Sequence, residues 1–156
     1  MALTIWVDGD ACPGAIKEIV LRAAERTQVV VVFVANKLLH LPPSRVARAV
    51  RVAAGPDVAD SHIVLHSEPG DLVVTADIPL AALLVPKGVV AIDPRGSLYS
   101  EENIAERLSV RDLMQGLRDT GELTGGPKAF DQKAKQRFAS TFDACLTKAI
   151  RATAGR

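Results

Sequence analysis

The chain has 156 residues, of which 48% are hydrophobic and 24% are charged, and its formal net charge is +1. This length fits one domain with a substantial core, and the composition is that of an ordinary globular protein. No apolar run approaches the roughly 20 residues that span a bilayer, and the N-terminal sequence lacks the basic region of a signal peptide. The two cysteines, Cys12 and Cys145, do not make a disulfide framework. We therefore expect one cytoplasmic domain, residues 1–156, without a membrane partner.

The charge is distributed unevenly along the chain. Seven basic and two acidic residues lie between Gly126 and Arg156, so the rest of the chain is slightly acidic. Such a basic segment either attracts a polyanion such as RNA or forms the solvated face of a helix. The net charge by itself gives no sign of nucleic-acid binding.

Strands and helices are expected to alternate over residues 1–98. Leu3–Val7 and Val29–Val34 are apolar runs rich in β-branched residues, which is the pattern of strands buried on both faces. Apolar residues at helical spacing predict a helix from Pro13 to about Arg26 between them. After Pro42 and Pro43 the pattern is ambiguous, and we prefer a short strand at Val50–Val52. The other expected elements are a helix from Asp57 to about Ser67, a strand at Leu72–Thr75, a short helix at Pro79–Val85 and a strand at Val89–Ile92.

This order predicts a doubly wound, mostly parallel sheet with helices on both faces, which is a three-layer α/β/α fold. Residues 100–154 are expected to add C-terminal helices. Apolar stripes there run from Ile104 to Leu108 and from Leu113 to Leu117, and Ser109 and Asp112 are spaced as a capping box between them. A loop at Thr124–Pro127 should precede a long amphipathic helix, whose apolar residues run from Ala134 to Ile150.

Acidic residues follow several of the predicted strands. They are Asp8 and Asp10 after the first strand, Asp60 at the start of a helix, Asp77 after Leu72–Thr75, and Asp93 after the last strand. In an open parallel sheet, sites form outside the carboxyl ends of the strands. Each aspartate alone is equally well explained as a helix cap or turn residue. Together, Asp8, Asp10, Asp60 and Asp77 predict a metal site.

Clustered carboxylates repel one another and raise their own pKa values unless a cation lies among them. Their hard oxygen atoms suit Mg²⁺ or Mn²⁺, ions that usually keep several waters and also bind substrate phosphates. Such an ion activates water and stabilises the charge of a phosphodiester transition state. The cluster is therefore typical of phosphoryl chemistry.

Three further residues are candidates for contact with a substrate phosphate. Asn36 and Lys37 follow the second strand and would approach the same edge of the sheet, although a loop cap and a solvated lysine explain them as well. Arg95, in Pro-Arg-Gly after the last strand, is suited to bidentate binding of a phosphate, with a surface turn as the alternative.

Two other enzyme classes share part of this pattern. A strand followed by Asp-x-Asp also opens the phosphatases that resemble haloacid dehalogenases, but their later Gly-Asp motif follows a strand, whereas Gly70-Asp71 precedes one. A cysteine hydrolase would use Cys12, whose position at a helix start favours a lowered pKa. The positions of the histidines in the sequence do not identify one of them as the catalytic partner of Cys12. Cys12 is therefore better explained as a small residue that begins a helix.

The chain resembles the bacterial YaiI/YqxD family over nearly its whole length. The motifs that carry the resemblance are Ile5-Trp-Val-Asp-Gly-Asp-Ala-Cys-Pro13, Val34-Ala-Asn36, Asp57-Val-Ala-Asp60, Gly70-Asp-Leu-Val-Val-Thr-Ala-Asp-Ile-Pro-Leu-Ala81, Pro94-Arg-Gly96 and Thr124-Gly-Gly-Pro127. The first motif usually reads Asp-Ala-Asp in that family, so Gly9 is a departure that keeps both carboxylates. The resemblance names a group and no activity.

That family in turn resembles the PIN-like nucleases. The resemblance implies that Asp8 is the first acid of the site, that Asp60 is the acid that opens a helix, and that Thr75 and Asp77 match the Thr-x-Asp after a strand. The middle Glu of active PIN nucleases has no clear counterpart on the first helix. Two hypotheses follow: a Mg²⁺- or Mn²⁺-dependent phosphodiesterase or ribonuclease, with Asp10 as an additional acid, and a PIN-like module that binds RNA or a protein without cleavage.

Overall fold

The structure, a computed structural model, describes residues 3–55, 57–121 and 130–154. In this part of the chain five strands form one sheet in the order β3-β2-β1-β4-β5, and every neighbouring pair is parallel. The strands are β1 (Thr4–Asp8), β2 (Val30–Ala35), β3 (Ala47–Arg51), β4 (Leu72–Val74) and β5 (Val90–Ile92). The helices are α1 (Gly14–Thr27), α2 (Val58–His66), α3 (Ile78–Leu84), the 3-10 helix η1 (Val85–Lys87), α4 (Ile104–Asp119) and α5 (Gln132–Ala154). The predicted α/β class is confirmed.

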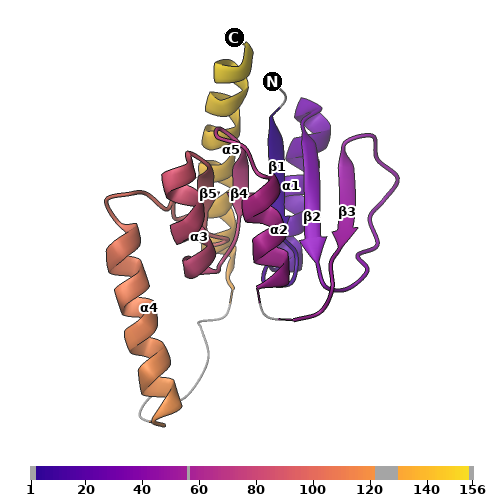
Figure 1. Cartoon of the computed structure of the whole chain (residues 1–156). Coiled ribbons are helices and arrows are strands. Elements are labelled where there is room, and N and C mark those ends of the chain that lie inside the picture. Colours follow the sequence, from indigo (N-terminus) through magenta and orange to yellow (C-terminus); the bar gives the residue numbers. More distant parts are fainter. Residues whose placement is uncertain (1–2, 56, 122–129, 155–156) are drawn as a thin grey trace.

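Helices cover both faces of the sheet and make three layers. Ile5 and Val7 of β1 pack into a cluster with residues of α1 and α5, whereas Trp6 packs into a second cluster with Ile63 of α2 and Leu80 of α3. Neighbouring side chains of a strand point to opposite faces. Helices α1 and α5 therefore cover one face, and α2 and α3 cover the other (Figure 1).

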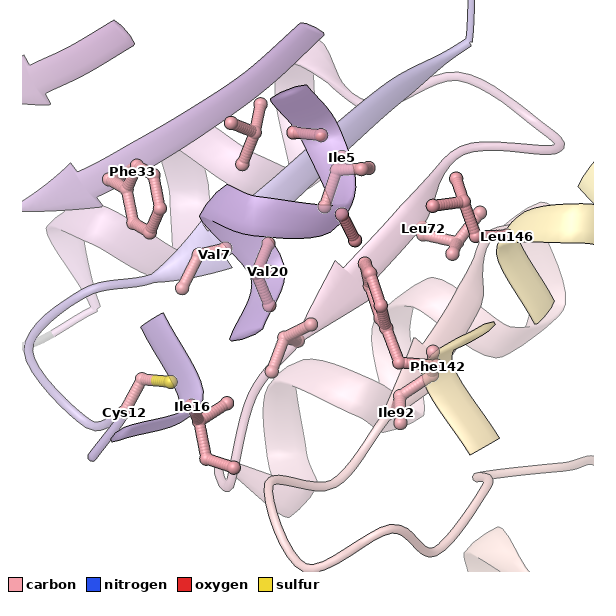
Figure 2. Packing of buried hydrophobic residues seen from close by; sticks show 14 of the residues in the cluster. Ile5, Val7, Cys12, Ile16, Val20, Phe33, Leu72, Ile92, Phe142 and Leu146 are labelled. Carbon is pink, nitrogen blue, oxygen red and sulfur yellow. The ribbon is translucent and has the colours of Figure 1, made fainter. Parts of the chain in front are cut away.

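The long C-terminal helix α5 contributes three large side chains to the first cluster. Phe138, Phe142 and Leu146 recur at a spacing of four residues and are at most 1% exposed. Figure 2 shows Phe142 and Leu146 close to Leu72 and Ile92 of the sheet. The predicted amphipathic helix is thus confirmed, because its apolar stripe is buried. The predicted loop at Thr124–Pro127 lies outside the described residues.

Asp71 joins the amino ends of β1 and β4. Its carboxylate accepts hydrogen bonds from the backbone N–H of Thr4 (3.1 Å), the indole N–H of Trp6 (3.1 Å) and the backbone N–H of Glu68 (2.9 Å). Trp6 is 8% exposed, which confirms that it belongs to the core. Because Asp71 is buried as well, these bonds supply the polar partners that its desolvated carboxylate requires.

Two predictions for individual elements were wrong. The strand expected at Val50–Val52 is observed at Ala47–Arg51, where each residue pairs with one of β2 from Val31 to Ala35. The capping box at Ser109 and Asp112 does not begin a helix, because both residues lie inside α4. Helix α4 extends away from the sheet, and none of its residues is buried (Figure 1).

Among the described residues, no helix is long and apolar enough to cross a membrane.

Candidate functional site

The strand order creates a switch point between β1 and β4. The chain runs from β1 through α1 to β2 on one side, and from β4 through α3 to β5 on the other. In parallel sheets, ligands bind in the crevice outside the carboxyl ends of the strands at such a point. Asp8 ends β1, and Thr75 directly follows β4. These two side chains therefore lie where a doubly wound fold places its site.

Thr75 connects two of the predicted acids. Its buried hydroxyl donates a hydrogen bond of 3.0 Å to the Asp8 carboxylate and accepts one of 2.9 Å from the backbone N–H of Asp77. The Asp77 carboxylate in turn accepts the N–H of Leu80 at 3.0 Å and caps α3. Asp77 can therefore both cap α3 and take part in the site, because the cap holds its carboxylate at the carboxyl end of the sheet.

Asp60 brings a third carboxylate to the same place from the first turn of α2. Burial, the charge of Asp77 and a hydrogen bond with its side chain raise the pKa of Asp60 from 3.8 to about 7, and the charge of Asp8 adds to the effect. Burial also raises the pKa of Asp8, and the charges of Asp77 and Asp10 add to this increase, whereas the bond from Thr75 opposes it. The structure thus brings Asp8, Asp60 and Asp77 close enough to interact.

Asp10 lies at the rim of this group and is exposed. Its carboxylate accepts the backbone N–H of Asn36 at 2.8 Å, so it fixes the loop after β2. Gly9, between the two acids, donates its N–H to the Val34 carbonyl at 2.7 Å, and a Cβ there would lie 3.1 Å from that oxygen. Glycine therefore lets the Asp-Gly-Asp turn lie tightly against β2.

The donor set fits a hydrated ion and not a closed cage. Among the described residues, no three His, Cys, Asp or Glu side chains converge as a ready-made group of metal ligands. Asp8, Asp60 and Asp77 nevertheless share one electrostatic environment. Mg²⁺ usually keeps several waters and binds one or two carboxylates plus substrate phosphates. The carboxylates present suit that mode, because an added cation would relieve their repulsion.

Tyr99 and Arg107, which the sequence analysis missed, contact Asp93 behind Thr75. The Tyr99 hydroxyl donates to either the Thr75 carbonyl oxygen (3.3 Å) or the Asp93 carboxylate (3.2 Å), and Arg107 reaches the same carboxylate at 3.5 Å. The Arg107 guanidinium also lies 4.3 Å from the centre of the Tyr99 ring. Burial and the charge of Asp93 raise the pKa of Tyr99. The one sequence signal was that Tyr99 is the only tyrosine of the chain.

The predicted substrate contacts are only partly brought together. Thr75 lies within the acidic group, and Asn36 reaches it through Asp10. Lys37 is exposed, with no hydrogen bond or ion pair among the described residues. The Arg95 guanidinium lies 5.7 Å from the centre of the Phe130 ring, and its backbone N–H donates to Asp93 at 2.6 Å. Arg95 thus packs against Phe130, and its contact with a substrate phosphate stays a prediction.

The structure weakens the two competing enzyme hypotheses. Burial raises the pKa of the Cys12 thiol to about 12, so it is protonated at neutral pH and is not an activated nucleophile. Asp71 of the Gly70-Asp71 pair lies at the amino ends of the strands, opposite to Asp8. A phosphatase of the haloacid-dehalogenase type would need its Gly-Asp acid near Asp8 instead.

Known proteins match this chain over almost its full length. A family model described as "Uncharacterized BCR, YaiI/YqxD family" matches residues 6–148. The chain is 56% identical to a UPF0178 protein of Syntrophobacter fumaroxidans over 94% of this chain and 95% of the relative. It is 55% identical to a UPF0178 protein of Myxococcus xanthus over 96% and 97% of the two chains. No solved structure matches it. The chain belongs to the YaiI/YqxD family.

Proposed function

We propose that the protein is a PIN-like phosphodiesterase that depends on Mg²⁺ or Mn²⁺ and acts on RNA in the cytoplasm. The observation that carries this proposal is the pair of hydrogen bonds by which Thr75 links Asp8 and Asp77 at the switch point of a parallel sheet, with Asp60 close enough to feel both carboxylates. Burial and the charges of Asp77 and Asp8 raise the pKa of Asp60 to about 7. A site that keeps such unfavourable charge together is expected to bind a cation.

The residues divide into ligands and positioning groups. One or two of the carboxylates of Asp8, Asp60 and Asp77 would hold the ion directly and the others through its waters, with Asp10 at the rim. The bound ion would supply Lewis-acid stabilisation of a phosphodiester transition state. Thr75 orients Asp8 and Asp77 through its two hydrogen bonds. Tyr99 and Asp93 support Thr75 from behind. Before the ion binds, Asp60 with a pKa of about 7 holds a proton that it can release near neutral pH.

The proposal is tested by measuring RNA cleavage with Mn²⁺ or Mg²⁺. We compare the unmodified protein with Asp8→Asn and Asp77→Asn, on single-stranded and structured RNA. Asp119→Asn is the matched control, because it makes the same substitution at an exposed position of α4. We expect cleavage by the unmodified protein and the control, and loss of cleavage in the two site variants.

The absence of metal-dependent cleavage above the level of the site variants would refute the nuclease. RNA binding without cleavage would instead support the non-catalytic, PIN-like binding module. Thermal unfolding with each metal gives a separate check, because an ion that binds only the native state must stabilise it. At a metal concentration of about 100 Kd the expected gain is about 2.7 kcal/mol, and Asp8→Asn should reduce it.

A further inference from the structure

One stretch of the chain is basic without any acidic residue. Between Asn36 and Gly55 the sequence contains no Asp or Glu, although the whole chain is nearly neutral. The Lys and Arg residues in this stretch are Lys37, Arg45, Arg48 and Arg51. We call these four residues the basic edge.

The basic edge follows the outermost strand of the sheet. Strand β3 pairs only with β2 in the described part of the chain, so it is an edge strand of the sheet, and the loop of residues 36–46 runs beside it (Figure 1). Arg45, Arg48 and Arg51 are all exposed. At about 3.3 Å per residue, Arg45 and Arg51 lie roughly 20 Å apart along this edge. Ala47 packs on one face of the sheet and Val50 on the other, so Arg48 and Arg51, three residues apart, leave the strand on opposite faces. The cations therefore flank the outer strand on both faces and do not form a cluster.

The basic edge ends at the same edge of the sheet as the acidic site. Arg51 is level with Ala35 of β2, and Val34 is level with Asp8 of β1. Two strand spacings of about 4.8 Å separate β3 from β1, so the backbones at Arg51 and Asp8 are roughly 10 Å apart. Lys37 follows β2 and therefore lies between these two strands at that edge. The end of β3 at Arg51 thus lies close to the acids.

The charges of the basic edge are not neutralised within the described part of the chain. The ion pairs there are Arg26–Asp143, Arg107–Asp93 and Arg111–Asp112, and none involves the basic edge. Two acids that contact this stretch accept hydrogen bonds from it: Glu25 accepts the Ser44 hydroxyl, and Asp10 accepts the N–H of Asn36. The four exposed cations form no ion pair in the described part of the chain and are thus available to a polyanion.

We propose that the basic edge binds the phosphate backbone of a single nucleic-acid strand and leads that strand to the acidic site. Cations spread along an extended strand match the spaced phosphates of a flexible nucleic-acid strand. The acidic site at its end favours a nucleic acid over an acidic peptide, since a divalent ion bridges carboxylates to phosphates. The inference rests on the proposed function, because it takes the acidic site as the place to which the bound strand is led.

Binding is measured by fluorescence anisotropy with a labelled RNA strand of 20 nucleotides, in EDTA and in the Asp8→Asn protein, so that cleavage plays no part. The test variant is Arg45→Gln/Arg48→Gln/Arg51→Gln. Each phosphate contact to a single strand contributes about 0.7 to the slope of log K against log salt. The triple variant should therefore lower this slope by about 2 and weaken binding about a hundredfold near 0.1 M salt.

The matched control removes three exposed arginines from other elements, Arg22→Gln/Arg118→Gln/Arg151→Gln. This control should leave the slope of log K against log salt unchanged, and its affinity for RNA should fall only a few-fold. Equal losses in both triple variants would overturn the basic edge in favour of general electrostatic attraction. If a polyglutamate peptide bound with the same dependence on Arg45, Arg48 and Arg51, the partner would be an acidic protein and the inference would fail.

Two further arms complete the design. A DNA strand of the same sequence separates the two sources of phosphate: equal binding supports recognition of the backbone alone, and weaker binding supports recognition of RNA.

Arg48→Gln alone should weaken binding about fivefold, which keeps the test valid if the triple variant is unstable. Arginine-dependent binding without cleavage in the metal assay would refute the nuclease and leave the basic edge standing.

Discussion

Replacing Asp60 by Asn should stabilise the metal-free protein at neutral and alkaline pH. Burial and the charges of Asp77 and Asp8 raise the pKa of Asp60 from 3.8 to about 7. The folded protein therefore keeps a proton between about pH 4 and pH 7 that the unfolded chain has released. Stability falls as the pH rises through this window, because the native state binds more protons than the unfolded state. Asparagine cannot ionise, so the variant escapes this loss.

The size of the effect follows from the shift. A change in pKa from 3.8 to about 7 corresponds to roughly 4 kcal/mol at about 1.36 kcal/mol per unit. Asp60 is partly exposed, so we halve this value for solvent screening and expect about 2 kcal/mol above pH 7. The advantage should shrink to about 1 kcal/mol near pH 5 and disappear below about pH 4, where both states are protonated.

Urea unfolding in EDTA at pH 5, 6, 7 and 8 measures this difference. With a slope near 2 kcal/mol per M, the midpoint should rise by about 1 M at pH 8 and by half as much at pH 5. Asp119→Asn, which is exposed on α4, should leave the midpoint unchanged at every pH. Saturating Mn²⁺ should then close the gap, because a cation among the carboxylates removes the repulsion that Asp60→Asn relieves.

The reasoning would be refuted if Asp60→Asn were no more stable than the unmodified protein at pH 8. A gain that is the same at pH 5 and pH 8 would be equally contrary to it. The first result would mean that neither burial nor the neighbouring charges disfavour the ionised Asp60 carboxylate in the folded protein. The second would mean that the gain has a cause other than ionisation.

Three other substitutions test the framework of the site. Gly96→Ala places a methyl group 2.7 Å from the backbone of α5 at a φ of +95°, and should lower the Tm by about 6–12 °C for a cost of about 3 kcal/mol. Asp71→Ala deprives three N–H donors of their acceptor and should cost at least ~3 kcal/mol in urea unfolding at pH 7. Thr75→Val leaves Asp8 without its hydroxyl partner; we expect a loss of about 2 kcal/mol in urea unfolding and, in the RNA assay, a loss of metal-dependent cleavage.

Each of these outcomes has a control. Gly116→Ala is the comparison for Gly96, because a Cβ at Gly116 meets nothing within 4 Å and alanine favours a helix by about 1 kcal/mol. Equal effects of the two alanines would contradict the close approach of α5. Asp71→Asn keeps one acceptor oxygen and should cost less than Asp71→Ala. If Thr75→Ser behaves like Thr75→Val, the hydroxyl is not what orients Asp8.

The sequence predicted most elements because their signals are local. β1, β2, β4 and β5 are apolar runs, and α5 carries an apolar stripe at helical spacing, so periodicity identifies them within a residue or two. Strand β3 was misplaced, since Val50 and Val52 favour a strand on their own, whereas pairing with β2 selects Ala47–Arg51. Ser109 and Asp112 have the spacing of a cap, but α4 continues through them.

For the candidate site, the positions of the acids after predicted strands were enough to assign Asp8 and Asp77 to one edge of a parallel sheet. Which strands are neighbours became clear from the three-dimensional fold. It placed β1 beside β4, and so brought Thr75 to 3.0 Å from Asp8 and raised the pKa of Asp60 to about 7. Tyr99 escaped prediction because hydrogen bonds between distant segments leave no periodic trace in a chain. The order of strands depends on contacts across the whole fold, whereas the type of each element depends on its nearest residues.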